Sequence, residues 1–241
     1  VIPILRKLKA GQSEREDGPQ SHLGKSGTPT MGGLLIIGAI LFATLIAGNF
    51  TNKFIVFLFI ITILFTTIGF YDDYLKLTRN KNGLSGKKKI AGQLIITALT
   101  FFFVYKFGLI NKEIDFSIVN PVFKNSYFYI TPVLFFVFMA LVIIGSSNAV
   151  NLTDGLDGLA TSTNIIAYAT YGIIATHAGQ NSIAVFCFCV VGGLAGFLLF
   201  NWKPAKVFMG DVGSLALGAG LAIISIMLHK EWTLLLVGII F

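Results

Sequence analysis

Two adjacent carboxylates lie shortly before a lysine in the segment Gly69-Phe-Tyr-Asp-Asp-Tyr-Leu-Lys76. Because adjacent carboxylates repel each other, they persist best where a cation neutralises them. Mg²⁺ is typically held by one or two carboxylates together with the phosphates of a substrate. Lys76 follows Asp72 by four residues, so on a helix it can pair with that carboxylate or reach a phosphate. The segment therefore indicates metal-assisted phosphate chemistry at Asp72 and Asp73.

A second polar run, Asn148-Ala-Val-Asn-Leu-Thr-Asp-Gly-Leu-Asp-Gly158, contains amides, carboxylates and glycines but neither Lys nor Arg. Hydrogen-bonding side chains beside glycines suit a sugar or a base better than a phosphate. The structural alternative is a polar loop that caps the next helix. The length of the run favours a binding function.

A third segment places Asp211 between Gly210 and Gly213, where a helix is predicted to begin. A carboxylate at a helix N-terminus can cap the helix, or it can hold a metal that faces a bound phosphate. Phe208 can offer a stacking surface to a planar base. The alternative for Phe208 is an ordinary core or lipid-facing aromatic side chain.

Two basic segments complete the set of polar motifs. The loop from His22 to Gly33 contains lysine, threonine and glycine and is similar to an anion cradle. The run Gly83-Leu-Ser-Gly-Lys-Lys-Lys89 has the composition of a membrane-flanking basic cluster. Such a cluster usually sets orientation, and it can also gather an anionic substrate.

The elements that carry these motifs must be membrane helices. Of the 241 residues, 55% are hydrophobic and 12% are charged, and the mean hydropathy is +0.81. Soluble domains carry about 25% charged residues, so an ordinary water-soluble enzyme, a disordered chain and a rod are excluded. We predict one all-α transmembrane bundle over residues 1–241. It has seven complete spans, at 32–50, 54–71, 91–110, 128–147, 159–177, 182–200 and 212–228, and an eighth span begins at 232.

The basic residues predict the orientation of this bundle. Thirteen of the 18 Lys and Arg fall in the segments 1–31, 72–90, 148–158 and 201–211, so the positive-inside rule makes these segments cytoplasmic. Five aspartates are expected at the same face: Asp72, Asp73, Asp154, Asp157 and Asp211. The net charge of +7 is thus explained by topology, and no nucleic-acid partner is expected.

Together these segments resemble the phospho-N-acetylmuramoyl-pentapeptide transferases, a branch of the polyprenyl-phosphate sugar-1-phosphate transferases. The stretches that carry the resemblance are 18–33, 70–76, 148–160 and 208–214. They occur in the family's order across nearly the whole chain. The run Gly-Thr-Pro-Thr-Met-Gly-Gly, which ends at Gly33, is the part most particular to this branch.

The resemblance implies a reaction and a place for it. Phospho-N-acetylmuramoyl-pentapeptide would pass from its UDP carrier to undecaprenyl phosphate with Mg²⁺, releasing UMP at the cytoplasmic face of the bacterial inner membrane. The favoured route is a single displacement, and the role of Asp73 as base or nucleophile stays open. The resemblance implies catalytic roles for Asp72, Asp73 and Asp211, with Asp211 and Asp72 as metal ligands. The substrate-binding residues it implies are Lys25, Thr30, Lys76, Lys88, Asn148, Asn151, Asp154, Asp157, Asn201 and Phe208.

The family has ten transmembrane helices and a histidine-rich cytoplasmic loop. We therefore expect this chain to be an internal piece that lacks the first and last helices and that loop, and to be inactive alone. A homodimer is one assembly left open. Two alternatives remain: a GlcNAc-1-phosphate transferase for another surface polymer, and an ion-coupled transporter that uses the carboxylates as a relay.

Overall fold

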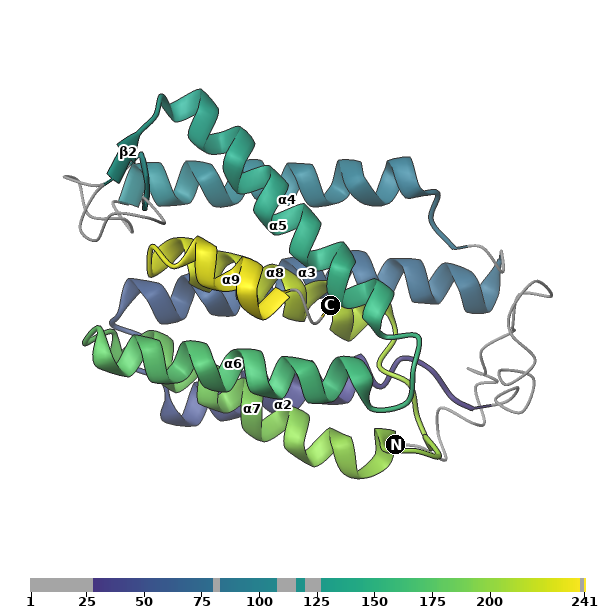
Figure 1. The fold of residues 1–241 in the computed structure, drawn as a ribbon. Helices are drawn as coiled ribbons and strands as arrows, with labels where there is room; N and C mark the ends of the chain where they lie inside the picture. The colour runs from purple at the N-terminus through teal and green to yellow at the C-terminus, as the bar shows by residue number, and fades with distance from the viewer. Residues whose placement is uncertain (1–27, 80–82, 108–115, 120–126, 239–240) are drawn as a thin grey trace.

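The computed structural model describes residues 28–79, 83–107, 116–119, 127–238 and 241. Over these residues the chain forms eight helices and one short hairpin, which confirms the all-α class (Figure 1). The helices are α2 (Gly33–Ala47), α3 (Lys53–Thr78), α4 (Gly86–Phe107), α5 (Pro132–Thr153), α6 (Leu159–His177), α7 (Asn181–Asn201), α8 (Asp211–Met227) and α9 (Glu231–Gly238). Strands β1 (Ser117–Val119) and β2 (Tyr127–Tyr129) pair antiparallel, with Ile118 opposite Phe128.

Four helices are long and apolar enough to cross a membrane: Lys53–Thr78, Gly86–Lys106, Pro132–Thr153 and Asn181–Asn201. Helices α2 and α8 are apolar but shorter. Each of the seven complete predicted spans contains a helix. Of the helices that the structure describes, four are long and apolar enough by themselves to cross a membrane. Helix α5 begins at Pro132 instead of 128, because residues 127–129 belong to β2. Its first turn is closed by Thr131, whose hydroxyl accepts from the N–H of Leu134.

Two segments predicted as loops, 72–90 and 148–158, begin as helix, and the helical part carries some of their polar residues. Helix α3 continues to Thr78 instead of stopping at 71, so both carboxylates lie on the helix. Helix α5 continues to Thr153, so Asn148 and Asn151 also lie on a helix instead of in a loop. The predicted spans stopped where the apolar residues stop, but α3 and α5 continue past those positions.

Helix α8 forms the centre of the bundle, and all 17 of its residues are buried. It packs mainly against α3 and α5. Without a hydrophobic force between helices in lipid, close packing depends on small residues. A Cβ at Gly69 would overlap the carbonyl of Asp211, and one at Gly33 would overlap the backbone of Gly213. The bundle therefore brings α2 and α3 into backbone contact with the first turn of α8.

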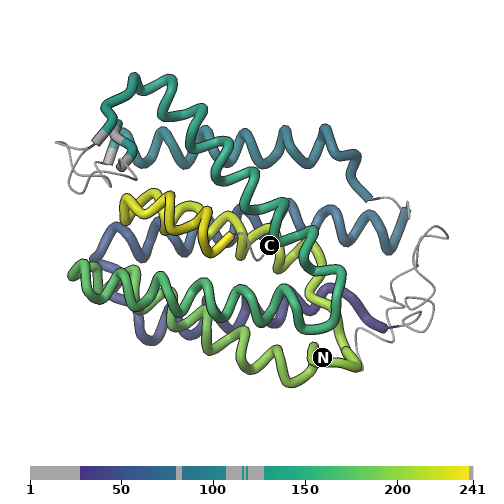
Figure 2. The backbone as a smooth tube through the Cα atoms, in the orientation of Figure 1, coloured from purple at the N-terminus to yellow at the C-terminus, as the bar shows by residue number. Residues whose placement is uncertain are grey.

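The helices run back and forth between two ends of the bundle (Figure 2). At one end lie the connections α3–α4, α5–α6 and α7–α8, seen on the right in Figure 1. We call this the site end. The hairpin and the connections α2–α3, α6–α7 and α8–α9 lie at the other end, which we call the far end. The polar motifs are thus collected at the site end.

Candidate active site

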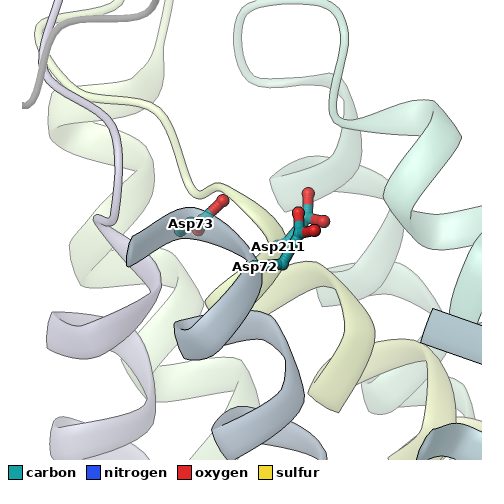
Figure 3. Close-up of side chains that lie close together, drawn as sticks. All are labelled: Asp72, Asp73 and Asp211. Atoms are coloured by element: carbon teal, nitrogen blue, oxygen red, sulfur yellow. The ribbon is translucent and has the colours of Figure 1, made fainter. Parts of the chain in front are cut away.

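Three carboxylates from two helices meet at the site end. Asp72 and Asp73 lie near the end of α3, and Asp211 is the first residue of α8. One oxygen from each lies within 4.8 Å of the others. Asp72 and Asp211 lie side by side, and Asp73, the next residue along α3, is seen beside them (Figure 3). The exposed fraction is 0% for Asp72, 2% for Asp73 and 8% for Asp211. Carboxylates buried to this extent need counter-charges close by.

Two lysines supply part of that counter-charge. The Nζ of Lys76 lies 2.5 Å from Asp72 Oδ2, 3.3 Å from Asp73 Oδ1 and 3.2 Å from Asp211 Oδ1. The Nζ of Lys89, in the first turn of α4, lies 2.5 Å from Asp211 Oδ2 and 3.4 Å from Asp72 Oδ2. When all three carboxylates are ionised, the two ammonium groups leave one negative charge in the cluster unbalanced, so the cluster can then accept a further cation.

Backbone groups fix the carboxylates in place. Asp72 Oδ1 accepts from the N–H of Leu84 at 2.7 Å, which ties the end of α3 to the segment that leads into α4. Asp73 Oδ2 accepts from the N–H of Val212 at 3.2 Å, in the first turn of α8. Gly210 fits between these helices with a φ of +74°, and a Cβ there would lie 2.5 Å from Asp73 Oδ2. Glycine is required at that turn by both its conformation and the close approach.

The α5 motif reaches the same cluster. Asn151 Nδ2 donates to Asp211 Oδ1 and to the hydroxyl of Ser214, both at 2.8 Å. Asp154 Oδ2 accepts from the N–H of Gly210 at 2.9 Å. Burial, together with the negative charges of Asp211 and Asp73, raises the pKa of Asp154 well above its usual range, although the hydrogen bond from Gly210 acts in the opposite direction.

Two predicted substrate residues, Asp157 and Asn201, hold the connection between α7 and α8. Asp157 Oδ2 accepts from the N–H of Ala205 at 3.1 Å. Asn201 is 2% exposed, and its amide bonds the hydroxyl of Thr161 at 2.7 Å and the carbonyl of Val207 at 3.0 Å. The oxygen and the nitrogen of the Asn201 side-chain amide are therefore both hydrogen-bonded to the protein in this structure. Its contact with the nucleoside stays a prediction.

The segment before α2 pairs with the end of this same connection. Phe208 N–H donates to the carbonyl of Pro29 at 2.9 Å, and Phe208 accepts from Gly32 N–H at 2.8 Å. Thr30 lies between them and is half-buried beside Gly210. Phe208 is 6% exposed, so its ring is packed here and does not form an open stacking face. Its role toward a base stays a prediction.

The remaining predicted substrate residues are Asn148, Lys88 and Lys25, and their contacts with a substrate stay predictions. Asn148 faces into the bundle one turn below Asn151 and bonds Gln93 Oε1 at 2.9 Å. Lys88 is exposed, and it is the neighbouring Lys89 that reaches the carboxylates. Lys25 lies outside the described residues.

Sequence reasoning missed Lys89, and one signal could have found it. Buried polar residues recur along the otherwise apolar α4 at Gln93, Thr97 and Thr100. Helical spacing places them on one face, and four residues before Gln93 that face reaches Lys89 and not Lys88. Ser214 ends the stretch 208–214 that carries the resemblance, but it was not among the predicted site residues.

Comparison with known proteins identifies the class that this fold and site define. Residues 54–229 match the model of glycosyl transferase family 4, which covers more than half of the chain. Residues 25–37, the segment that leads into α2, match signature 1 of the phospho-N-acetylmuramoyl-pentapeptide-transferases.

Three relatives agree with that signature. The chain is 46% identical over 244 residues to the phospho-N-acetylmuramoyl-pentapeptide-transferase of Listeria monocytogenes, 47% identical to that of Listeria innocua and 45% identical to that of Bacillus anthracis. In each case the match covers 100% of this chain and 73% of the relative. The chain therefore belongs to the phospho-N-acetylmuramoyl-pentapeptide-transferases of glycosyl transferase family 4, and it is a bacterial integral membrane protein.

Proposed function

We propose that the protein transfers phospho-N-acetylmuramoyl-pentapeptide from UDP to undecaprenyl phosphate, giving lipid I and UMP in peptidoglycan synthesis. The observation that carries this proposal is the cluster of Asp72, Asp73 and Asp211 with Lys76 and Lys89. The cluster lies at one end of apolar helices, where a lipid phosphate and a water-soluble nucleotide can meet. The family of the chain supplies the substrate class.

We further infer that the site end faces the cytoplasm across the bacterial inner membrane. The excess of Lys and Arg in the segments at that end supports this orientation. A UDP-linked donor is made in the cytoplasm, so the same orientation gives the donor direct access. The far end, with its hairpin, then lies outside.

The donor set of the cluster fits Mg²⁺. Carboxylate oxygens are the ligands that this ion prefers, and it commonly takes one or two of them with substrate phosphates. Asp72 and Asp211 already share one cationic group, since the Nζ of Lys89 lies 3.4 Å and 2.5 Å from their Oδ2 atoms. Asp211 and Asp72 are therefore the residues that would hold the ion. Mg²⁺ bound there would neutralise charge on the diphosphate.

The reaction exchanges one bond to phosphorus for another. An oxygen of the lipid phosphate bonds to the sugar-linked phosphorus of the donor, and the bond from that phosphorus to the UMP oxygen breaks. The lipid phosphate is largely ionised at neutral pH, because its second pKa is about 6. Direct attack therefore needs little help from Asp73. Lys76 and Lys89 are placed to stabilise the negative charge that develops on the phosphate oxygens.

The test uses the full-length protein, because the chain spans 73% of its relatives' length. Reconstituted protein is given undecaprenyl phosphate, Mg²⁺ and either UDP-N-acetylmuramoyl-pentapeptide or UDP-GlcNAc, and UMP release is followed. We expect turnover with the first donor alone, its loss on chelation and its return with added Mg²⁺. A preference for UDP-GlcNAc would contradict the proposal.

A transporter remains the competing class, and the positions of the acidic groups count against it. Among the described residues, acidic side chains lie only near helix ends or in connections, at Asp72, Asp73, Asp154, Asp157, Asp211 and Glu231. A proton relay needs ionisable groups near the middle of the membrane. Proton flux in liposomes without UMP release would favour transport.

A further inference from the structure

A second polar layer crosses the bundle directly beneath the carboxylates. Gln93 Nε2 donates to the hydroxyl of Ser147 at 3.2 Å, and that hydroxyl donates to the carbonyl of Leu215 at 3.0 Å. All three residues are fully buried. The layer thus joins α4, α5 and α8 by side-chain hydrogen bonds inside an apolar bundle.

Each member of this layer is four residues from a group in the site. Gln93 follows Lys89 on α4, Ser147 precedes Asn151 on α5, and Leu215 follows Asp211 on α8. Residues four apart share a helix face and are separated by about one turn, 5.4 Å. The same three helices therefore meet twice, once in the layer and once in the site.

In the site, the contact between these three helices depends on Asp211. Lys89 Nζ lies 2.5 Å from its Oδ2, and Asn151 Nδ2 lies 2.8 Å from its Oδ1. Both side chains reach it from helices that the lower layer connects. Both polar atoms of the Gln93 amide take part in this connection, since its Oε1 also accepts from Asn148 on α5 at 2.9 Å.

We propose that Gln93 is a positioning residue, which holds α4 against α5 and α8 and so sets where Lys89 and Asn151 meet Asp211. Helix α4 needs such a link because little of it is buried: only 28% of its most apolar stretch lies inside the protein. The consequence for catalysis rests on the proposed function, whereas the consequence for helix placement does not.

The chain offers a matched control on the same face of α4. The hydroxyl of Thr100 is buried, but it bonds the carbonyl of Ile96 within its own helix at 2.8 Å. Thr100→Val therefore removes a buried hydrogen bond without cutting a link between helices. Gln93→Met keeps the length of the side chain and cuts that link, while Ser147 keeps Leu215 and Asn148 keeps Ile144 as partners.

The first measurement is steady-state kinetics of the full-length protein. We expect kcat of Gln93→Met to fall roughly ten- to a hundredfold with little change in KM for the UDP donor, because a misplacement of about 1 Å can cost on the order of 100-fold. A kcat that follows thermal stability, or that Thr100→Val lowers equally, would overturn the positioning role.

The second measurement needs no activity. Nitroxide labels are attached to cysteines at the exposed positions Lys88 and Leu152, at the site ends of α4 and α5, after Cys187 and Cys189 are replaced by alanine. The distance distribution between labels should broaden or shift in Gln93→Met and stay unchanged in Thr100→Val. An unchanged distribution in Gln93→Met would overturn the proposal. If the wild type releases no UMP, the proposed function fails, and these distances still decide the role of Gln93.

Discussion

Lys88 and Lys89 are adjacent in the sequence, yet α4 directs them to different surroundings. Lys89 contacts Asp72 and Asp211, whereas Lys88 is exposed. We predict that Lys89→Met lowers kcat/KM of the full-length protein by roughly ten- to a hundredfold, because the variant loses a cation beside the phosphates and leaves buried carboxylates less neutralised. Lys87→Met, which removes an exposed lysine of the same run, serves as the control and should stay near wild type. Equal losses in both variants would assign the effect to membrane-surface charge.

Asp211 accepts from Asn151 on α5 and pairs with Lys76 on α3 and Lys89 on α4, so three other helices meet at this carboxylate. We predict that Asp211→Asn lowers turnover by at least roughly 100-fold, as expected for loss of a main electrostatic group, and weakens the dependence on Mg²⁺. Glu231→Gln is the control, since Glu231 is a buried carboxylate that begins α9 at the far end. Near-normal turnover of Asp211→Asn at ordinary Mg²⁺ would remove Asp211 from the site.

Residue types and spacing predicted the carboxylates well, because charge beside an apolar span is rare and therefore informative. Asp72, Asp73, Asp211 and Lys76 are gathered as expected. Lys88 came from the resemblance, and its contact with a phosphate stays a prediction, whereas Lys89 pairs with the carboxylates. Adjacent residues on a helix point about 100° apart, so the run of three lysines alone did not show which of them faces the cluster.

At the scale of elements, the contact between α3 and α8 has no side chain between the backbones at Gly69. We predict that Gly69→Ala destabilises the protein by roughly 1–3 kcal/mol or more, as overpacking does. It should also abolish turnover, because it separates Asp72 and Asp73 from Asp211. The measurements are thermal unfolding in detergent and UMP release.

Gly192→Ala is the matched control for that substitution. Gly192 and Gly196 form a GxxxG pattern on α7, but a Cβ at either would meet nothing within 4 Å among the described residues. Gly192→Ala should therefore leave both stability and turnover unchanged. If it is as harmful as Gly69→Ala, close approach at Gly69 is not the cause.

Helix existence was predictable from apolar length, but helix ends and partners were not. The apolar part of α3 stops near residue 71, while the helix continues to Thr78 because Lys76 pairs with Asp72 four residues earlier. The hairpin has strands of only three residues, too short to show a periodic pattern. The central place of α8 depends on long-range packing of small residues, which composition alone does not locate.

At the scale of the whole molecule, the orientation proposed above is directly testable. Single cysteines are placed at Lys88, on the site end, and at Thr51, on the far end, in a background without Cys187 and Cys189; both positions are exposed. A membrane-impermeant maleimide added to intact spheroplasts should label Thr51→Cys and not Lys88→Cys. Labelling in the reverse pattern would place the carboxylates outside and contradict the proposed use of a cytoplasmic donor.

The burial of α8 on every side has a consequence for how the molecule is made. A ribosome delivers the helices in chain order, so α2 to α7 enter the membrane before α8 is complete. Helices α3 and α5 cannot complete their packing at that stage, because both pack mainly against a helix that has not yet been made. The same late helix begins with Asp211. Insertion of α8 therefore fills the centre of the bundle and brings Asp211 to the other two carboxylates in one event, and a nascent chain that stops before residue 211 has neither.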